Sequence, residues 1–196
     1  MRVRPDEAHV NVGVVTTAAT AEQTGAQNAE DSEAAIAELR KVLGSEADIH
    51  TTGYSLNPDY HYQPGGGSPT ITGYTANNTV EVRIDDLKMV GKVIDAVTAN
   101  GANTISGIQF TLRDERQVRA EALKQAALNA RANAEAIAAA LGVRVIGLAS
   151  AETSEVQVPR PMMAMAREQK AFATTPIEPG TIEVHAEVQV TLEVTP

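Results

Sequence analysis

Residues 71–113, ITGYTANNTVEVRIDDLKMVGKVIDAVTANGANTISGIQFTLR, decide the fold because they predict a strand, a helix and a second strand in succession. Apolar and polar residues alternate up to Ile84, as expected for a strand with one buried face. A stripe of apolar residues at helical spacing follows, formed by Leu87, Val90, Ile94 and Val97. Asn100-Gly101 ends that helix, and alternation returns over Ile108, Phe110 and Leu112.

The segment before this stretch predicts a strand, a long helix and a further extended segment. Valines at every second position indicate a strand over residues 8–17. A capping-box pattern at Thr20 opens an amphipathic helix that ends at Gly44. Extended segments are predicted over 48–56 and 70–84. The intervening NPDYHYQPGGGSP, residues 57–69, is rich in Pro and Gly, so we expect an irregular, flexible hairpin connection.

The segment after it predicts one long helix and two strands. An alanine-rich helix is expected over about 115–141, followed by a strand over 143–153. Residues 181–194 alternate without error and predict one strand about 45 Å long, which would cross two lobes or pair with another subunit. The order βαββαβ followed by αββ indicates an α+β fold with a mixed, mostly antiparallel sheet packed by amphipathic helices. Residues 1–196 would form a single domain or two intertwined lobes.

Composition limits the classes of partner. The 43% of hydrophobic residues suffice for a real core, while Trp is absent and only two Phe are present. A net charge of −9 would repel nucleic acid and anionic lipid headgroups. No stretch approaches the length of a membrane span, and the absence of Cys excludes disulfides and thiolate metal sites.

Four segments together resemble the SIMPL domain family of mostly exported bacterial proteins. They are VRPDEAHVNVGV near the start, GYTANNTVEVRIDDLKMVGKVIDAVTANGANTISGIQFTLRD, the alanine-rich helix with its LGV exit, and TPIEPGTIEVHAEVQVTLEV. The resemblance covers nearly the whole chain. It implies an α+β fold, a place in the cell envelope, oligomers in some members, a setting in oxidative-stress defence for others, and no established catalytic residues.

The resemblance implies a periplasmic or secreted protein. Residues 1–20 lack a charged start followed by an apolar run, and the first strand begins within a few residues of Met1. We therefore expect the native gene to encode a signal peptide ahead of Arg2.

The tyrosines form the first candidate site. All four fall within 21 residues and are joined by His61: Tyr54, Tyr60, Tyr62 and Tyr74. They could form a partner-binding lip, because tyrosine gives rigid amphipathic contact area. The alternative is a β-hairpin whose aromatic residues pair across the strands and pin the loop.

The second candidate is a Pro/Met-rich arm over residues 156–179, which contains Met162, Met163 and Met165. A thioether cluster could bind Cu(I) or scavenge oxidants. The alternative is an arm whose methionines pack against its own or a neighbouring subunit, because Met fills irregular gaps. We expect assembly into a homo-oligomer through this arm and the terminal strand.

No residue pattern specifies a reaction, a cofactor or a metal site. The glycines at 65–67 precede a strand and lack the lysine of a phosphate-binding loop, and no GxSxG motif is present. His9 and His185 would meet only if the first and last strands pair. We therefore expect a non-enzymatic envelope protein that acts through self-assembly and partner binding. The alternatives are a Met-based copper or oxidant buffer, and an enzyme with an unrecognised site near the tyrosine and histidine hairpin.

Overall fold

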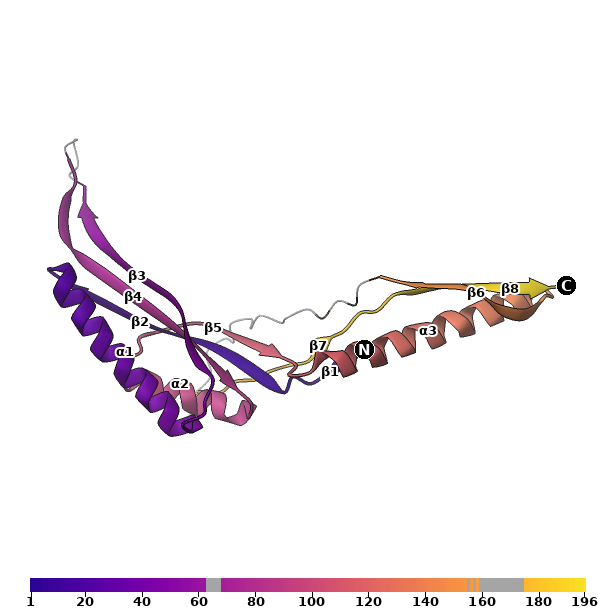
Figure 1. Cartoon of the computed structure of the whole chain (residues 1–196), viewed down its shortest axis with the longest axis horizontal. Coiled ribbons are helices and arrows are strands. Elements are labelled where there is room, and N and C mark those ends of the chain that lie inside the picture. Colours follow the sequence, from indigo (N-terminus) through magenta and orange to yellow (C-terminus); the bar gives the residue numbers. More distant parts are fainter. Residues whose placement is uncertain (63–67, 155, 157, 159–174) are drawn as a thin grey trace. The chain divides into compact units, whose positions relative to one another are not determined.

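The computed structural model describes residues 1–62, 68–154, 156, 158 and 175–196, and the chain divides into two units. The four-stranded unit comprises Asp6–Thr111 and the described part of Met162–Pro179. The terminal unit comprises Met1–Pro5, Gly180–Pro196 and the described part of Leu112–Pro161. Figure 1 shows the helices and strands of both units.

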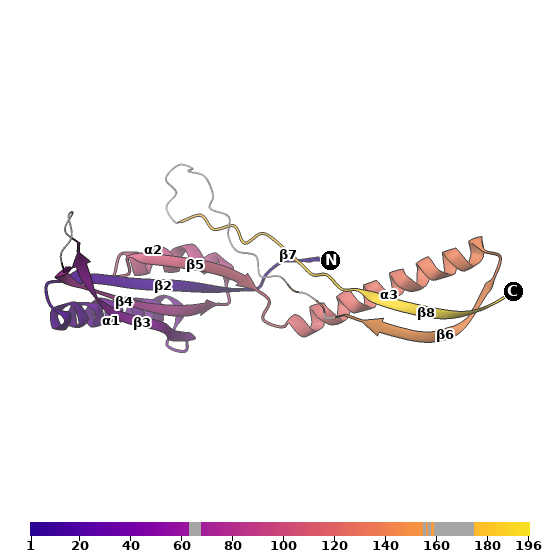
Figure 2. The same ribbon diagram turned by 90° about the horizontal axis from the view of Figure 1, so that it is seen from above.

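The four-stranded unit contains an antiparallel sheet with the strand order β3-β4-β2-β5. Its strands are β2 (Glu7–Ala18), β3 (Ile49–His61), β4 (Thr70–Ile84) and β5 (Thr104–Thr111). Figure 2 shows β2 running between β4 and β5. The predicted strands near 8–17, 48–56 and 70–84 are confirmed.

Two helices cover one face of this sheet (Figure 1). Helix α1 (Ala21–Leu43) begins where the Thr20 hydroxyl accepts a hydrogen bond from the Gln23 amide at 3.2 Å, which confirms the predicted cap. A 3₁₀ turn, η1 (Leu87–Met89), leads into α2 (Val90–Thr98). The apolar residues of β2, β4 and β5 pack against those of the helices in a core that includes Val10, Val82, Phe110 and, from α2, Val93.

The chain returns to the four-stranded unit near its end. Ile177 packs against the core, and the Thr175 hydroxyl donates a hydrogen bond to Asp95 on α2 at 2.6 Å. The Thr175 amide donates to the other carboxylate oxygen of Asp95 at 3.2 Å. Gly91 permits this contact, because a Cβ at its position would overlap the carbonyl oxygen of Thr175.

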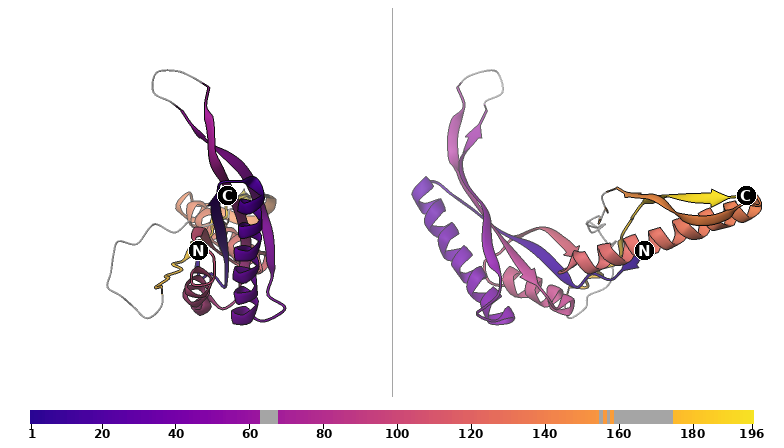
Figure 3. Two further views of the ribbon diagram at one scale, coloured as in Figure 1. Left: turned by 90° about the vertical axis from the view of Figure 1, so that its left-hand side faces the viewer. Right: turned by 45° about the vertical axis from the view of Figure 1, so that its right-hand side comes forward.

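The β3–β4 hairpin extends beyond the rest of its sheet. Tyr74 on β4 pairs with Ala18 at the end of β2, whereas β3 continues to His61 opposite Thr70. The prediction that residues 57–69 are irregular is therefore wrong for the first five, because cross-strand pairing to β4 holds them extended. The predicted flexible glycines, 65–67, lie outside the described residues. Figure 3 shows the two strands projecting as a ribbon.

The terminal unit contains the long helix α3 (Glu115–Ala140) and two small sheets. Strand β6 (Arg144–Thr153) pairs antiparallel with β8 (Val188–Thr195), and β1 (Arg2–Val3) pairs antiparallel with β7 (Ile182–Glu183). A small core joins them, formed by Leu112, Ala122, Val156, Ile182 and Val184. The α+β class and the antiparallel pairing are thus confirmed.

The prediction of one continuous strand over 181–194 is wrong. Its first part, β7, pairs with β1, and its second part, β8, pairs with β6. The strand is interrupted between Glu183 and Val188 because the two parts belong to different sheets. Strict alternation marks both parts equally and does not identify their partners.

Candidate functional site

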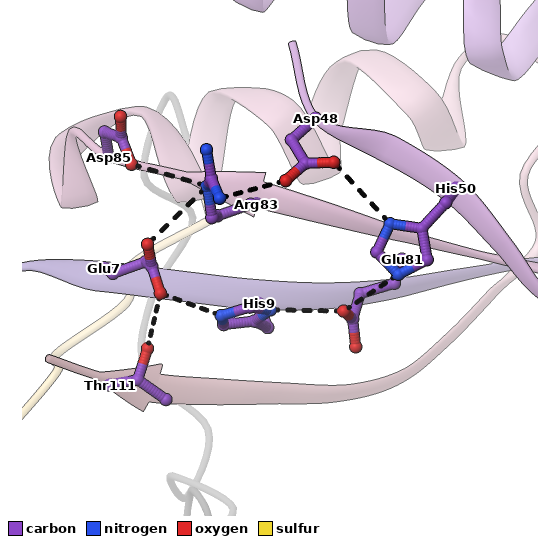
Figure 4. A network of polar contacts seen from close by, with 8 residues as sticks. All are labelled: Glu7, His9, Asp48, His50, Glu81, Arg83, Asp85 and Thr111. Atoms are coloured by element: carbon purple, nitrogen blue, oxygen red, sulfur yellow. Dashed lines mark hydrogen bonds and ion pairs between the residues drawn. The ribbon is translucent and has the colours of Figure 1, made fainter. Parts of the chain in front are cut away.

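A network of charged side chains lies on the face of the four-stranded sheet opposite α1 and α2 (Figure 4). Successive side chains of a strand point to opposite faces, so Val10 and Val82 enter the core while His9, Glu81 and Arg83 lie on the other face. The network joins all four strands. Its members are Glu7, His9, Asp48, His50, Glu81, Arg83, Asp85 and Thr111.

Glu7 lies at the centre of the network, and only 7% of the residue is exposed. Its Oε1 accepts a hydrogen bond from the Thr111 hydroxyl at 3.1 Å and lies 3.0 Å from His9 Nε2. Its Oε2 lies 3.6 Å from Arg83 Nε. A buried carboxylate needs such partners because burial removes its hydration.

Two imidazoles share the carboxylate of Glu81. His9 Nδ1 lies 3.2 Å and His50 Nε2 lies 3.4 Å from the same oxygen, Glu81 Oε1. The other nitrogen of His50 lies 3.7 Å from Asp48 Oδ1. A neutral imidazole has one N–H and can donate to one carboxylate, whereas the imidazolium can donate to two. Each histidine therefore links two carboxylates fully only when it is protonated.

Arg83 completes the network. Its Nη1 lies 3.0 Å from Asp48, and its Nε lies 3.9 Å from Asp85 as well as near Glu7. Among the residues that the structure describes, no group of three or more His, Asp or Glu side chains is placed to hold a metal ion. The network contains no nucleophile beyond the Thr111 hydroxyl, which donates to Glu7. It ties β2, β3, β4 and β5 together and does not form a recognisable catalytic site.

This network was not predicted from the sequence. The meeting of His9 with His185 does not occur, because β2 pairs with β4 and β5, while His185 lies in the terminal unit, 3.9 Å from Glu183. The sequence does indicate part of this network. Glu7 and His9 are two residues apart and share the polar face of one predicted strand, and Glu81 and Arg83 share the polar face of another. Their register, which depends on pairing over long sequence separations, was not predictable.

The candidate tyrosines lie on the β3–β4 hairpin, as predicted for a hairpin. Tyr54, Tyr60 and Tyr62 are 58%, 51% and 70% exposed, and Tyr74 is partly buried. The prediction that tyrosines lie directly opposite one another across the strands is wrong. Tyr54 opposes Asn78, Tyr60 opposes Ile71, and Tyr74 opposes Pro58. His61 opposes Thr70 at the end of the strand. Tyr54, Tyr60 and Tyr62 are therefore accessible to solvent.

The candidate methionines, Met162, Met163 and Met165, lie outside the described residues. The described ends of the Pro/Met-rich arm pack in different units. Val156 and Val158 contact the core of the terminal unit, and Ile177 contacts the core of the four-stranded unit.

An apolar groove of about 570 Å³ lies in the terminal unit between α3 and the β6–β8 sheet. Aliphatic residues from the helix and both strands line most of it, including Leu128, Val145, Leu148, Val190 and Leu192. Lys124 and Arg131 of α3 also line it. The same unit exposes several large apolar residues at 50% or more: Leu128, Ile137, Leu141, Ile146, Leu148 and Val194.

The sequence of this chain matches a described family over nearly its whole length. The sequence model of SIMPL, described as a protein of unknown function (DUF541), matches residues 1–192. The chain belongs to the SIMPL family. It is also similar to the 26 kDa periplasmic immunogenic proteins of Brucella melitensis and Brucella abortus, each 32% identical over 175 residues, 86% of this chain and 68% of the relative.

This SIMPL protein is periplasmic or secreted, in agreement with the names of its relatives. In the described part of the chain, no helix combines the length and the apolar character needed to cross a bilayer.

The basic start of α3 in this SIMPL protein is balanced by acidic neighbours. Arg119 pairs with Glu115 at 2.8 Å, and Lys124 lies 3.5 Å from Glu121. Arg116 donates a hydrogen bond from its side chain to Asp114, which lowers the pKa of Asp114 and raises the pKa of Arg116. These pairs make the start of α3 a face with interleaved acidic and basic side chains.

Proposed function

We propose that this SIMPL protein is a non-enzymatic envelope protein that acts by assembling with copies of itself and by binding partner proteins of the envelope. The observation that carries the assembly half is the apolar surface of the terminal unit, where six large apolar residues are half exposed or more. Three of them, Leu128, Ile146 and Leu148, line the apolar groove, and a soluble protein rarely leaves a contiguous apolar surface uncovered unless it is an interaction surface.

The architecture of the terminal unit supports the same proposal. Of the 26 residues of α3, only Ala122 and Ala138 are buried. Strands β6 and β8 form a sheet of two strands, and a two-stranded sheet is only marginally stable in water. Covering the groove with the same unit of a second copy would bury Leu and Ile side chains, each worth about 1.5–3 kcal/mol when fully removed from water.

The non-enzymatic half rests on the chemistry of the polar side chains. The imidazoles of His9 and His50, and the guanidinium of Arg83, are already held by carboxylates on an open sheet face. An enzyme would need convergent polar groups around a bound substrate. A role in defence against oxidative or envelope stress is the physiological setting suggested by the family, and sensitivity of a deletion strain to oxidants would test it.

Light scattering at several concentrations tests assembly. We expect the intact chain to be an oligomer at tens of micromolar, and we expect Ile146→Thr with Leu148→Thr to weaken it. The control is Ile71→Thr, which removes a side chain of similar exposure from the four-stranded unit. A monomeric intact chain, or equal assembly of the double variant and the control, would refute the terminal unit as the assembly surface.

A second variant tests the Pro/Met-rich arm, with residues 158–176 replaced by a short Gly/Ser linker. We expect it to assemble less well, because we propose that the arm contributes contacts between copies. If the shortened and intact chains assemble equally well, the arm does not contribute to assembly, and the apolar groove alone remains the proposed assembly surface.

A further inference from the structure

We propose that the tyrosine face of the β3–β4 hairpin, with the acidic end of α1 beside it, binds a basic amphipathic peptide segment of a partner protein. This inference rests on the partner-binding half of the proposed function and names the chemistry of the partner. It is independent of assembly through the terminal unit.

The hairpin presents an apolar stripe on one side of β3. From Tyr54 to Tyr62 the sequence is YSLNPDYHY, in which apolar or aromatic residues occupy every second position. Alternation along a strand places this set on one face and Ser55, Asn57, Asp59 and His61 on the other. Leu56 is 37% exposed, and Ile71, opposite Tyr60, is 51% exposed. The stripe is thus an accessible apolar surface, within which the register of β3 against β4 shifts between Asp59 and Tyr60.

The stripe continues along the flank of α1. A Cβ at Gly25 of α1 would lie 3.8 Å from the Tyr54 hydroxyl, so the end of this side chain lies against the helix. From there a hollow of about 490 Å³ follows α1, lined by Ala29, Glu33, Ile36, Arg40 and Asn78 among others, so its walls carry one acidic and one basic side chain. Stripe and hollow together offer an elongated track, a shape that fits an extended peptide.

The charge of this surface favours a positively charged partner segment. No Lys or Arg occurs in residues 5–39 or 42–82, whereas α1 carries Glu22, Glu30 and Glu33, all exposed. An extended segment with Lys or Arg would meet these carboxylates, and its cations would also be attracted to exposed tyrosine rings. The exposed carboxylates beside the hairpin disfavour a second copy of this same surface and an anionic lipid surface at this place.

The size of the surface favours a peptide over a folded domain. A tyrosine buries about 150–250 Å² when fully covered. At the observed exposures, the three tyrosines offer roughly 270–450 Å², compared with about 800 Å² on each side of a standard protein interface. A single extended segment covers an area of this size.

Tyrosine fluorescence tests the proposal directly, because the chain has no Trp and its four tyrosines all lie on β3, on β4 or just past His61. The probe is a synthetic peptide of alternating Lys and Val, and the control peptide has Glu in place of Lys. We expect a saturable change in tyrosine emission with the Lys peptide that weakens as salt is added. We expect no such change with the Glu peptide.

Matched variants locate the binding surface. Tyr60→Thr with Tyr62→Thr removes two rings from the stripe, and Asn57→Thr with His61→Thr alters the opposite face of the same strand. We expect the first pair to weaken binding about tenfold or more and the second to leave it unchanged, because exposed aromatic anchors dominate small interfaces. Glu30→Gln with Glu33→Gln should weaken binding and reduce its salt dependence.

Three results would overturn the proposal: no saturable signal with the Lys peptide, equal binding of the Glu peptide, or equal loss in both hairpin variants. A change in tyrosine emission with protein concentration alone would overturn it in favour of a second copy on this face. Light scattering of the same samples reports assembly separately, so failure of peptide binding in an intact oligomer refutes this inference without refuting assembly.

Discussion

Replacing Gly91 by alanine separates two physical arguments that predict opposite signs. Gly91 is the second residue of α2, and alanine has the higher helix propensity by about 1 kcal/mol. Propensity alone therefore predicts a more stable protein. The structure predicts a less stable one, because the added Cβ would overlap the carbonyl oxygen of Thr175.

The size of the destabilisation depends on which atoms must move to make room for the new Cβ. A backbone carbonyl cannot rotate away as a side chain can, so residues near Thr175 must shift and strain both hydrogen bonds to Asp95. Overpacking of this kind costs about 1–3 kcal/mol, and each hydrogen bond contributes about 1 kcal/mol. After subtracting the propensity gain, we expect a loss of about 1–2 kcal/mol in the free energy of unfolding. For a chain of this length that lowers Tm by about 2–8 °C.

Urea unfolding followed by circular dichroism measures the effect, and Gly25→Ala is the matched control. A Cβ at Gly25 would have one neighbour within 4 Å, the Tyr54 hydroxyl at 3.8 Å, so that substitution should stabilise the protein. In an Asp95→Ala background, the cost of Gly91→Ala should shrink because the Thr175 segment is held less firmly. Stabilisation by Gly91→Ala in the intact chain would refute the reasoning.

Three further predictions concern the core, the network and the cap of α3. Phe110→Ala should lower the free energy of unfolding by about 3–5 kcal/mol in a urea titration, because Phe110 is 1% exposed. Glu7→Gln should cost about 1–3 kcal/mol by the same measurement because Arg83 and His9 lose a charged partner, while Glu22→Gln should change stability by less than about 0.5 kcal/mol. Arg116 lowers the pKa of Asp114, so this carboxylate contributes stability above its unfolded-state pKa and loses it as pH falls through the lower folded pKa. Acid titration of helicity should show that loss in the intact chain and not in Asp114→Asn, and equal acid sensitivity of the two would contradict it.

Local patterns predicted the elements of this fold because their signals are contained within each segment. The valines of β2, the cap at Thr20 and the apolar stripe of α2 were all visible in the sequence and were confirmed. Alternation also predicts which residues of β4 are buried, because Val82 lies in the core and Glu81 lies on the open face.

Pairing between distant segments was not predictable from these patterns. The split of the last strand depends on β1 and β6, which lie about 180 and 40 residues away along the chain. The charged network depends on register, because only the observed pairing brings His50 of β3 and His9 of β2 to one oxygen of Glu81. Extension of β3 through Pro58 overrode the turn propensity of its residues.

The pairing of β1 with β7 sets the order in which the protein can acquire its structure. Val3 lies opposite Ile182, and the Val184 amide donates a hydrogen bond to the Met1 carbonyl at 2.8 Å. Closing this sheet joins residues about 180 positions apart, and closing so long a loop is slow. The core around Ile182 stays open until then, whereas Asp6–Thr111 already contains all four strands of its own sheet. A chain with this topology can therefore form its four-stranded sheet before it closes the β1–β7 pair.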